Sequence, residues 1–568
     1  TRADLWHIRK GLYATVAGNR PSGTTALLED IAVPVAALAG TCDSLLGLFA
    51  RHGYEESVIF GHAKDGNIHF LINERFDRPA SLARYSAFTE DMVELVLGND
   101  GTLKAEHGTG RIMAPFVRRQ YGDELYAVMR EVKGLLDPHG VLNPGVLLND
   151  DPMSHLRDLK ITPTVEAEVD RCVECGYCEP VCPSRDLTLT PRQRIVLRRA
   201  LATANQTGDH DLARQLEEEY VYDGIQTCAV DGMCQTACPV LIDTGDLVRR
   251  LRGEAHKPLQ EVAWRSAGRH WGIVNAGLSV AMDVAAHVPA AVLQPVTDAA
   301  RRVVGSDVMP QWDEALPTGG ARRRPRHAAA PAAVYFPACV NTMFGAAAGD
   351  SGVHEAFLAL CERAGVRVSV PDGIGAMCCG TPWKSKGMTS GYEGMRDRVG
   401  PWLWRATDGG RLPVVCDAAS CTEGLRVIVE SVERDHGVSV AVVDSVAFIA
   451  ERILPALTVT HRLGAVAVHP TCSSTRLTVN ADLLALARTF ADEAVVPDGW
   501  GCCAFAGDRG LLHPELTASA TAAESRAVAT RDFDAYVSLN RTCELGMSRA
   551  TGRDYRHVLE VLEECTRP

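Results

Sequence analysis

Two short cysteine runs carry the clearest chemical signal in the sequence. The first, CVECGYCEPVCP, has four cysteines in the spacing C-x2-C-x2-C-x3-C-P. Thiolates spaced in this way bind the irons of a four-iron cluster. The alternative is a structural zinc knot, but zinc ligands usually come as more widely separated pairs. The run therefore predicts a 4Fe-4S cluster, with these ligands: Cys172, Cys175, Cys178 and Cys182.

The second run, CAVDGMCQTACP, departs from this spacing at one position. Cys228, Cys234 and Cys238 keep their offsets, but Asp231 stands where the second thiolate belongs. A carboxylate oxygen can bind iron, although it is a harder and more labile ligand than a thiolate. We expect a second cluster that is either ligated by Asp231 or is a three-iron cluster with Asp231 unbound. A vacant second site is the remaining alternative.

The two runs together predict a relay of neighbouring clusters. In two-cluster proteins the fourth cysteine of each run binds the cluster of the other run. One cluster is then expected on Cys172, Cys175, Cys178 and Cys238, and the other on Cys182, Cys228 and Cys234 with Asp231 as candidate fourth ligand.

The last part of the chain repeats a third cysteine pattern. Segments such as GAMCCGTPWKSKG and GWGCCAFAGDRG correspond between the two halves. The pattern resembles the CCG domains of heterodisulfide reductases and of the iron–sulfur subunits of glycolate oxidase and anaerobic glycerol-3-phosphate dehydrogenase. It is incomplete, because Ala418 and Asn540 replace one cysteine of each unit and Ala504 replaces the glycine kept as Gly380. A further iron–sulfur centre and a buried structural or electron-conduit domain both stay open. The cysteines concerned are Cys339, Cys378, Cys379 and Cys421, and then Cys472, Cys502, Cys503 and Cys543.

Near the start of the chain, histidines and a carboxylate suggest a different metal site. GHAKDGNIHF contains His62 and His69, and KAEHGTGRI contains Glu106 and His107. Two imidazoles and a carboxylate suit a divalent ion with open coordination positions. The alternative is structural histidines, because these two positions on one continuous strand would point to opposite faces. A turn at residues 65–67 would bring both to one site.

Composition limits the class of protein that must position these groups. The chain has 568 residues, 46% hydrophobic and 23% charged, with a formal net charge of −13. This length predicts several domains, and the negative charge argues against a nucleic-acid-binding surface. We see no secretory signal and expect a cytoplasmic protein, at the inner face of the plasma membrane if it associates peripherally. The apolar stretch from Trp271 to Leu293 is interrupted by polar residues, which disfavours a bilayer span.

The predicted fold is multidomain, α+β and α/β. Residues 1–150 alternate strand-like and helical runs, and 151–265 form a helical cluster-binding region in which Thr190 and Pro191 begin a helix. A helical segment and linker follow at 266–332. The duplicated pattern predicts two related α/β units, 333–455 and 456–568.

Five segments of the first region resemble the C-terminal half of FAD-linked oxidases of the D-lactate, glycolate and D-2-hydroxyglutarate dehydrogenase group. They are LWHIRKG, EDIAVP, GHAKDGNIH, AEHGTGR and LDPHGVLNPG. The resemblance implies a ferredoxin-like cap domain in which His62, His69 and Glu106 bind a Zn2+-type ion that holds the substrate. It further implies His107 as general base and Arg9 as the substrate-carboxylate ligand. Asn143 would approach the flavin, and Glu106 and His107 are also expected as cofactor-binding residues.

Two departures from that family affect the expected substrate and cofactor. Leu28 stands near the position of a second carboxylate-binding lysine, so selection for a dicarboxylate is in doubt. The FAD-binding domain that precedes the cap in the family is not found, and is expected in a missing N-terminal part or in a separate subunit.

The order of cap, cluster region and CCG units resembles fused bacterial FAD and iron–sulfur oxidoreductases. We expect the C-terminal part of such a dehydrogenase, or a split-gene product, that oxidises a D-2-hydroxy acid. D-Lactate is favoured and D-2-hydroxyglutarate is second. Electrons would pass from FAD through the clusters to a quinone, cytochrome or other carrier. The alternatives are an iron–sulfur electron-transfer subunit for a separate flavoprotein and a CCG-type disulfide reductase.

Overall fold

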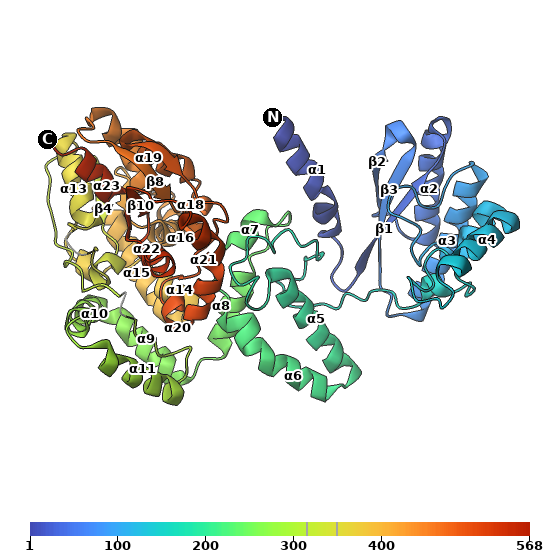
Figure 1. Cartoon of the computed structure of the whole chain (residues 1–568), viewed down its shortest axis with the longest axis horizontal. Helices are drawn as coiled ribbons and strands as arrows, with labels where there is room; N and C mark the ends of the chain where they lie inside the picture. The colour runs from blue at the N-terminus through green and yellow to red at the C-terminus, as the bar shows by residue number, and fades with distance from the viewer. Residues whose placement is uncertain (314–315, 348–349) are drawn as a thin grey trace. The chain divides into compact units, whose positions relative to one another are not determined.

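The computed structural model describes residues 1–313, 316–347 and 350–568 and divides into two compact units (Figure 1). The first unit comprises Thr1–Cys175 and Ile195–Ala213. The second comprises Gly176–Arg194 and Arg214–Pro568. The chain is therefore mixed α/β, with the metal-ligating candidates distributed over both units.

The first unit is built on a three-stranded antiparallel sheet in the order β1-β3-β2. Apolar side chains of β3, such as Phe70, pack with Phe49 and Phe88 of two covering helices in one buried core. Because side chains alternate along a strand, His69 points to the opposite face of the sheet. The elements are α1 (Arg2–Ala17), β1 (Thr25–Ala32), α2 (Leu38–His52), β2 (Val58–His62), β3 (Asn67–Glu74), α3 (Pro79–Gly98) and α4 (Val117–Leu136).

A tight turn joins β2 to β3, as predicted for residues 65–67. Gly66 ends the short helix η2 (Ala63–Asp65) with φ at 69°, a left-handed value that favours glycine. A Cβ at this position would lie 1.9 Å from the carbonyl oxygen of Val33. The turn therefore needs glycine, and it returns the chain so that Phe60 pairs with His69 and His62 with Asn67.

Helices of 5 to 17 residues follow in the cysteine-rich region. The predicted start of α5 at Thr190 and Pro191 is confirmed, since the Thr190 hydroxyl accepts from the Gln193 amide and the Gln193 side chain accepts from the Thr190 amide. The elements are α5 (Pro191–Thr207), α6 (His210–Tyr220), the π-helix η5 (Val221–Gln226), α7 (Met233–Ala237) and α8 (Thr244–Glu254).

Helices α9 (Pro258–Arg269), α10 (Trp271–Ala285) and α11 (Ala290–Val304) come next. Among the described residues, none of the helices has both the length and the apolar character needed for a bilayer span. In the described residues of the following stretch, 305–313 and 316–332, there is no helix or named strand, but the stretch is not a detached linker. Arg323 is buried and donates to the backbone carbonyls of Pro337, Gly375 and Met377. This coil is thus part of the adjoining α/β unit.

Two four-stranded parallel sheets complete the second unit, in the orders β5-β4-β6-β7 and β9-β8-β10-β11. The order is the same in both, which agrees with the predicted duplication. The first has β4 (Ala333–Phe336), α12 (Val340–Met343), α13 (Val353–Arg363), β5 (Val368–Ser369), α14 (Thr381–Lys386), α15 (Thr389–Ala406), β6 (Val414–Cys416), α16 (Ala419–His436), β7 (Val442–Asp444) and α17 (Ser445–Phe448). The second has β8 (Leu463–Val468), α18 (Cys472–Arg476), α19 (Asn480–Phe490), β9 (Ala491–Val495), α20 (Arg509–Leu512), α21 (Pro514–Val528), β10 (Ala535–Ser538), α22 (Arg541–Thr551), β11 (Tyr555–His557) and α23 (Val558–Cys565).

Candidate active site and electron-transfer centres

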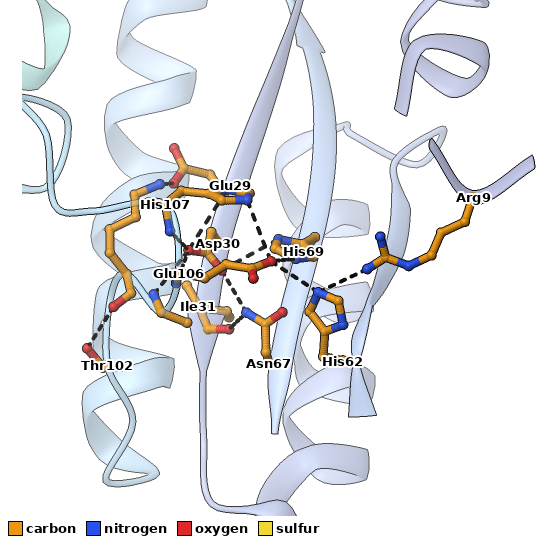
Figure 2. A network of polar contacts seen from close by, with 12 residues as sticks. Arg9, Glu29, Asp30, Ile31, His62, Asn67, His69, Thr102, Glu106 and His107 are labelled. Carbon is orange, nitrogen blue, oxygen red and sulfur yellow. Dashed lines mark hydrogen bonds and ion pairs between the residues drawn. The ribbon is translucent and has the colours of Figure 1, made fainter. Parts of the chain in front are cut away.

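His62, His69 and Glu106 converge on one face of the first unit's sheet (Figure 2). The Nε2 atoms of His62 and His69 lie 3.1 and 2.9 Å from the same oxygen, Oε1 of Glu106. Arg9 of α1 reaches the site, with Nη2 at 3.3 Å from Nε2 of His62. Two imidazole nitrogens and a carboxylate oxygen this close together fit a zinc-type divalent ion, with a guanidinium beside it.

Asp30 is a buried carboxylate that positions other residues of this site. It lies opposite His69 in the β1–β3 pairing, and its Oδ1 is 3.5 Å from Nδ1 of His69. Its Oδ2 accepts the backbone amides of Ala105, Glu106 and His107. One buried carboxylate thus fixes both the ring of a candidate ligand and the loop that presents another. Sequence reasoning missed Asp30, although it lies within the EDIAVP segment.

The electrostatics of the site favour ligation by neutral histidine. Burial lowers the pKa of His69, so its ring is neutral near pH 7. Burial raises the pKa of Asp30, but the amides of His107 and Glu106 donate to it and bring its pKa below the ordinary value. Asp30 is therefore ionised and can accept from Nδ1 of His69, which leaves Nε2 for an ion.

His107 and Asn143 were predicted to act beside this ion. His107 stacks on His69 with ring centroids 4.8 Å apart, and its Nε2 is 3.6 Å from Oε1 of Glu106. Its side chain is 44% exposed, which keeps it accessible to a bound substrate. Asn143 lies in an exposed turn with φ at 45°. A role for Asn143 toward flavin stays a prediction.

The second predicted cluster site is a cavity in the second unit. Cys182, Cys228, Cys234 and Asp231 all line it. The three thiols are buried, and burial raises the pKa of Asp231 to about 6. Three buried thiols around one cavity fit the thiolate chemistry of an iron–sulfur cluster.

Arg194 is a cation at this cavity that sequence reasoning missed. It is almost fully buried, and its Nη1 lies 3.8 Å from Sγ of Cys182. Burial lowers its pKa, but the neighbouring Cys228 and Cys182 outweigh that effect and raise it. A positive charge beside thiolates offsets their negative charge. In the sequence Arg194 is one of several arginines in an amphipathic helix, so nothing local indicated this role.

The other predicted cluster rests on the sequence alone. The boundary between the two compact units falls between Cys175 and Gly176, within the first cysteine run. The pairing of Cys172, Cys175, Cys178 and Cys238 therefore stays a prediction.

In both α/β units the cysteines follow the carboxyl ends of the two central strands. Cys339 follows β4 and Cys421 follows β6, and Cys472 and Cys543 follow β8 and β10. The strand order reverses between these central strands, which is where open parallel sheets bind ligands. The duplicated cysteines thus occupy the ligand-binding edge of each sheet.

In the first α/β unit, neighbouring cysteine thiols contact one another in one continuous series. Sγ of Cys339 lies 3.6 Å from Sγ of Cys378, and Cys379 hydrogen-bonds Cys421. Cys416, at the end of β6, joins through Cys421. Sequence reasoning left Cys416 out of the site because Ser538 takes its place in the second unit.

The second set carries a buried ion pair. Cys472 contacts Cys502, and Cys503 contacts Cys543. The thiol of Cys543 and the ring of His469 lower the pKa of Cys503 to about 5. Nδ1 of His469 is 2.8 Å from Glu524, and both side chains are buried. The set therefore includes a buried thiolate that a protonated histidine can stabilise.

Comparison with known proteins identifies two domains. The family of FAD linked oxidases, C-terminal domain, matches residues 1–147. The 4Fe-4S dicluster domain matches residues 168–242. The chain therefore carries a FAD-linked oxidase C-terminal domain followed by a 4Fe-4S dicluster domain.

Particular relatives share this oxidase region. The mitochondrial D-lactate dehydrogenase (cytochrome) of Kluyveromyces lactis is 31% identical over 159 residues, 27% of each chain. The D-2-hydroxyglutarate dehydrogenase of Escherichia coli K12 is 25% identical over 280 residues, 39% of this chain and 27% of that protein. Glycolate oxidase subunit GlcD of Bacillus subtilis is 28% identical over 148 residues, 26% of this chain and 30% of that protein. The chain spans 27 to 30% of the length of these relatives.

Proposed function

We propose that the chain is part of an FAD- and iron–sulfur-dependent dehydrogenase that oxidises a D-2-hydroxy acid to the 2-oxo acid. D-Lactate is the favoured substrate and D-2-hydroxyglutarate the second, with electrons leaving to a cytochrome or quinone-type acceptor. The observation that carries the proposal is the convergence of His62, His69 and Glu106 beside Arg9. An ion with open positions next to a guanidinium suits a substrate whose hydroxyl and carboxylate are adjacent.

Each residue of the site has a separate role in the proposed reaction. His62, His69 and Glu106 would hold a divalent ion, whose Lewis acidity would favour loss of the substrate hydroxyl proton. Arg9 binds the carboxylate and orients the C–H bond. His107 takes the hydroxyl proton, and the Asp30 carboxylate, with Oδ2 at 3.9 Å from Nδ1 of His107, stabilises the resulting imidazolium. A bound flavin would supply the hydride acceptor.

The remaining regions of the chain suit the transfer of electrons away from the flavin. Clusters held by the cysteine runs would accept the two electrons of a reduced flavin one at a time. Leu28 pairs with Leu71 in the sheet and supplies no cation for a second carboxylate, which favours lactate over a dicarboxylate. A ferredoxin-like cap at 1–150, a cluster region at 151–265 and paired CCG units at 333–455 and 456–568 form part of the same proposal.

Flavin reduction tests the proposal. The full gene product is mixed anaerobically with a panel of D-2-hydroxy acids, and the flavin absorbance is followed by stopped flow. We expect D-lactate to bleach the flavin, and His62→Ala to slow bleaching about 100-fold or more with flavin content unchanged. His139→Ala, an exposed histidine of the same unit, is the matched control. Unchanged bleaching in His62→Ala would remove the ion from the mechanism.

A further inference from the structure

Asp231 meets two cysteines of the second α/β unit. Its carboxylate and the Sγ atoms of Cys472 and Cys502 all lie within 4.8 Å of one another. These residues come from the second cysteine run, from α18 and from the loop before α20. The same aspartate lines the cavity of Cys182 and Cys228. Asp231 therefore stands between two groups of thiols that the sequence assigned to separate domains.

The backbone around Asp231 is held in an unusual conformation. Val230 has φ at 54° and Gly232 has φ at 72°, so left-handed residues stand on both sides. A β-branched residue in this region is a true outlier, and such strain persists where the surroundings impose it. The Oδ2 atom of Asp231 is buried and has no hydrogen-bond partner among the described atoms. The carboxylate also accepts from the Cys502 thiol and from the backbone amide of Met233, so one of its two oxygens is held beside Cys502 while the other stays without a partner in the described part of the chain.

The opposite side of the site is fixed as well. A Cβ at Gly232 would lie 1.5 Å from Nη1 of Arg476, the last residue of α18. Thr471 caps α18 through the amide of Ser474, which fixes the start of the helix at Cys472. The amide of Ala504 donates to Sγ of Cys502 at 3.4 Å. The close packing of Gly232 on Arg476 holds α18 and the cysteine run in register.

The first α/β unit serves as an internal comparison. Its equivalent pair, Cys339 and Cys378, is joined by a 3.6 Å contact. Cys339 of that pair is approached by the guanidinium of Arg323 and the indole of Trp271, neither of which offers an electron pair to a metal. Only the pair in the second unit has a carboxylate in that place, among the residues that the structure describes.

We propose that Asp231, Cys472 and Cys502 ligate one metal, ferrous iron or zinc, as a two-thiolate and one-carboxylate centre of the second α/β unit. The second cluster is then held by three thiolates, those of Cys182, Cys228 and Cys234. Thiolates select iron and zinc, and a carboxylate oxygen is an ordinary additional ligand for either metal. Asp231 then lies between the two centres, because it lines the cavity of the second cluster and ligates the metal beside it. The inference goes beyond the proposed activity and does not depend on which hydroxy acid is oxidised.

Metal content and electron paramagnetic resonance (EPR) test the assignment on the full chain, purified anaerobically. Iron, zinc and acid-labile sulfide are counted per chain, and spectra are recorded before and after dithionite. We expect Asp231→Ala, Cys472→Ser and Cys502→Ser each to lose the same metal or to alter the same signal. The signal that Cys228→Ser removes should persist in all three. Cys339→Ser, at the equivalent position of the other unit, should leave both features intact.

The opposite grouping overturns the proposal. If Asp231→Ala alters the Cys228-dependent signal while the metal that depends on Cys472 and Cys502 stays at the wild-type level, Asp231 belongs to the second cluster. A chain whose metal content does not depend on Cys472 or Cys502 refutes the centre outright. Asp231→Asn keeps the size of the side chain and gives the same discrimination if the alanine variant does not fold.

A variant that adds a thiolate ligand gives a second test of the proposal. Asp231→Cys restores the full C-x2-C-x2-C-x3-C-P spacing. We expect the added thiolate to join Cys472 and Cys502, so that their metal is retained and its spectrum changes while the three-thiolate cluster signal stays. Conversion of that cluster to an all-thiolate four-iron signal, with the other metal unchanged, contradicts the proposal.

Discussion

Asp30 is the residue on which the candidate ion site depends most, and with His69 and His107 it forms a second group of ligand atoms within 4.8 Å of one another. It accepts three consecutive amides of the Glu106 loop and faces Nδ1 of His69. A carboxylate behind a ligating histidine fixes the ring and raises its basicity. Two of the three candidate ion ligands therefore take their position from one side chain.

The variant Asp30→Asn tests this role. The amide side chain keeps the size but loses the charge and one acceptor, so we expect the affinity for zinc to fall by about 10 to 100-fold. The free energy of unfolding should fall by about 1 to 3 kcal/mol, because buried donors lose their partner. Zinc titration and urea unfolding measure both. The exposed Asp43→Asn is the control, and wild-type zinc affinity in Asp30→Asn would contradict the account.

The sequence predicted His62, His69 and Glu106 because their types and the turn between the strands are local features. It did not predict Asp30, since its role depends on the register of β1 against β3. By spacing alone, it left Asp231 either as a ligand of the second cluster or as an unbound residue beside a three-iron cluster. The left-handed backbone at Val230 and the close packing of Gly232 on Arg476 of α18 belong to the tertiary structure, and no local pattern encodes them.

At the scale of elements, the β2–β3 turn decides whether the two histidines meet. Gly66 combines a left-handed φ with close approach of the Val33 carbonyl. We expect Gly66→Ala to lower the free energy of unfolding by at least about 2 kcal/mol and to weaken zinc binding, because the strain adds to a backbone clash. Gly140→Ala, also at a left-handed φ but with open space around it, should cost about 1 kcal/mol. Equal stabilities of the two variants would show that the clash is relieved elsewhere.

The coil before β4 provides a second test at this scale. Composition alone marked it as a linker, because Pro, Gly and Arg show no periodicity. Arg323 instead satisfies three backbone carbonyls of the first α/β unit. We expect Arg323→Ala to lower the free energy of unfolding by about 2 to 4 kcal/mol, since these carbonyls lose a charged donor. The neighbouring, exposed Arg322→Ala should change it by less than about 0.5 kcal/mol, and an equally small effect of Arg323→Ala would restore the linker interpretation.

At the scale of the whole molecule, the duplication was predictable and its asymmetry was not. Recurrent cysteine segments indicated two α/β units, and both sheets have the same strand order. Gly380 and Ala504 even share a left-handed backbone at equivalent positions, with φ at 81° and 57°. The different neighbours of the two thiol pairs, Trp271 and Asp231, come from segments outside the repeat. A comparison of the repeats therefore cannot reveal them.

The central claim is that a D-2-hydroxy acid bound at the His62, His69 and Glu106 site supplies the electrons that reduce the clusters. Freeze-quench EPR of the full gene product mixed with D-lactate, without chemical reductant, tests it most directly. The account predicts reduced-cluster signals in the wild type and in His139→Ala, and their loss in His62→Ala. Dithionite should still reduce the clusters of His62→Ala. Cluster reduction by D-lactate at the wild-type rate in His62→Ala, or none in the wild type with any D-2-hydroxy acid, would contradict the account.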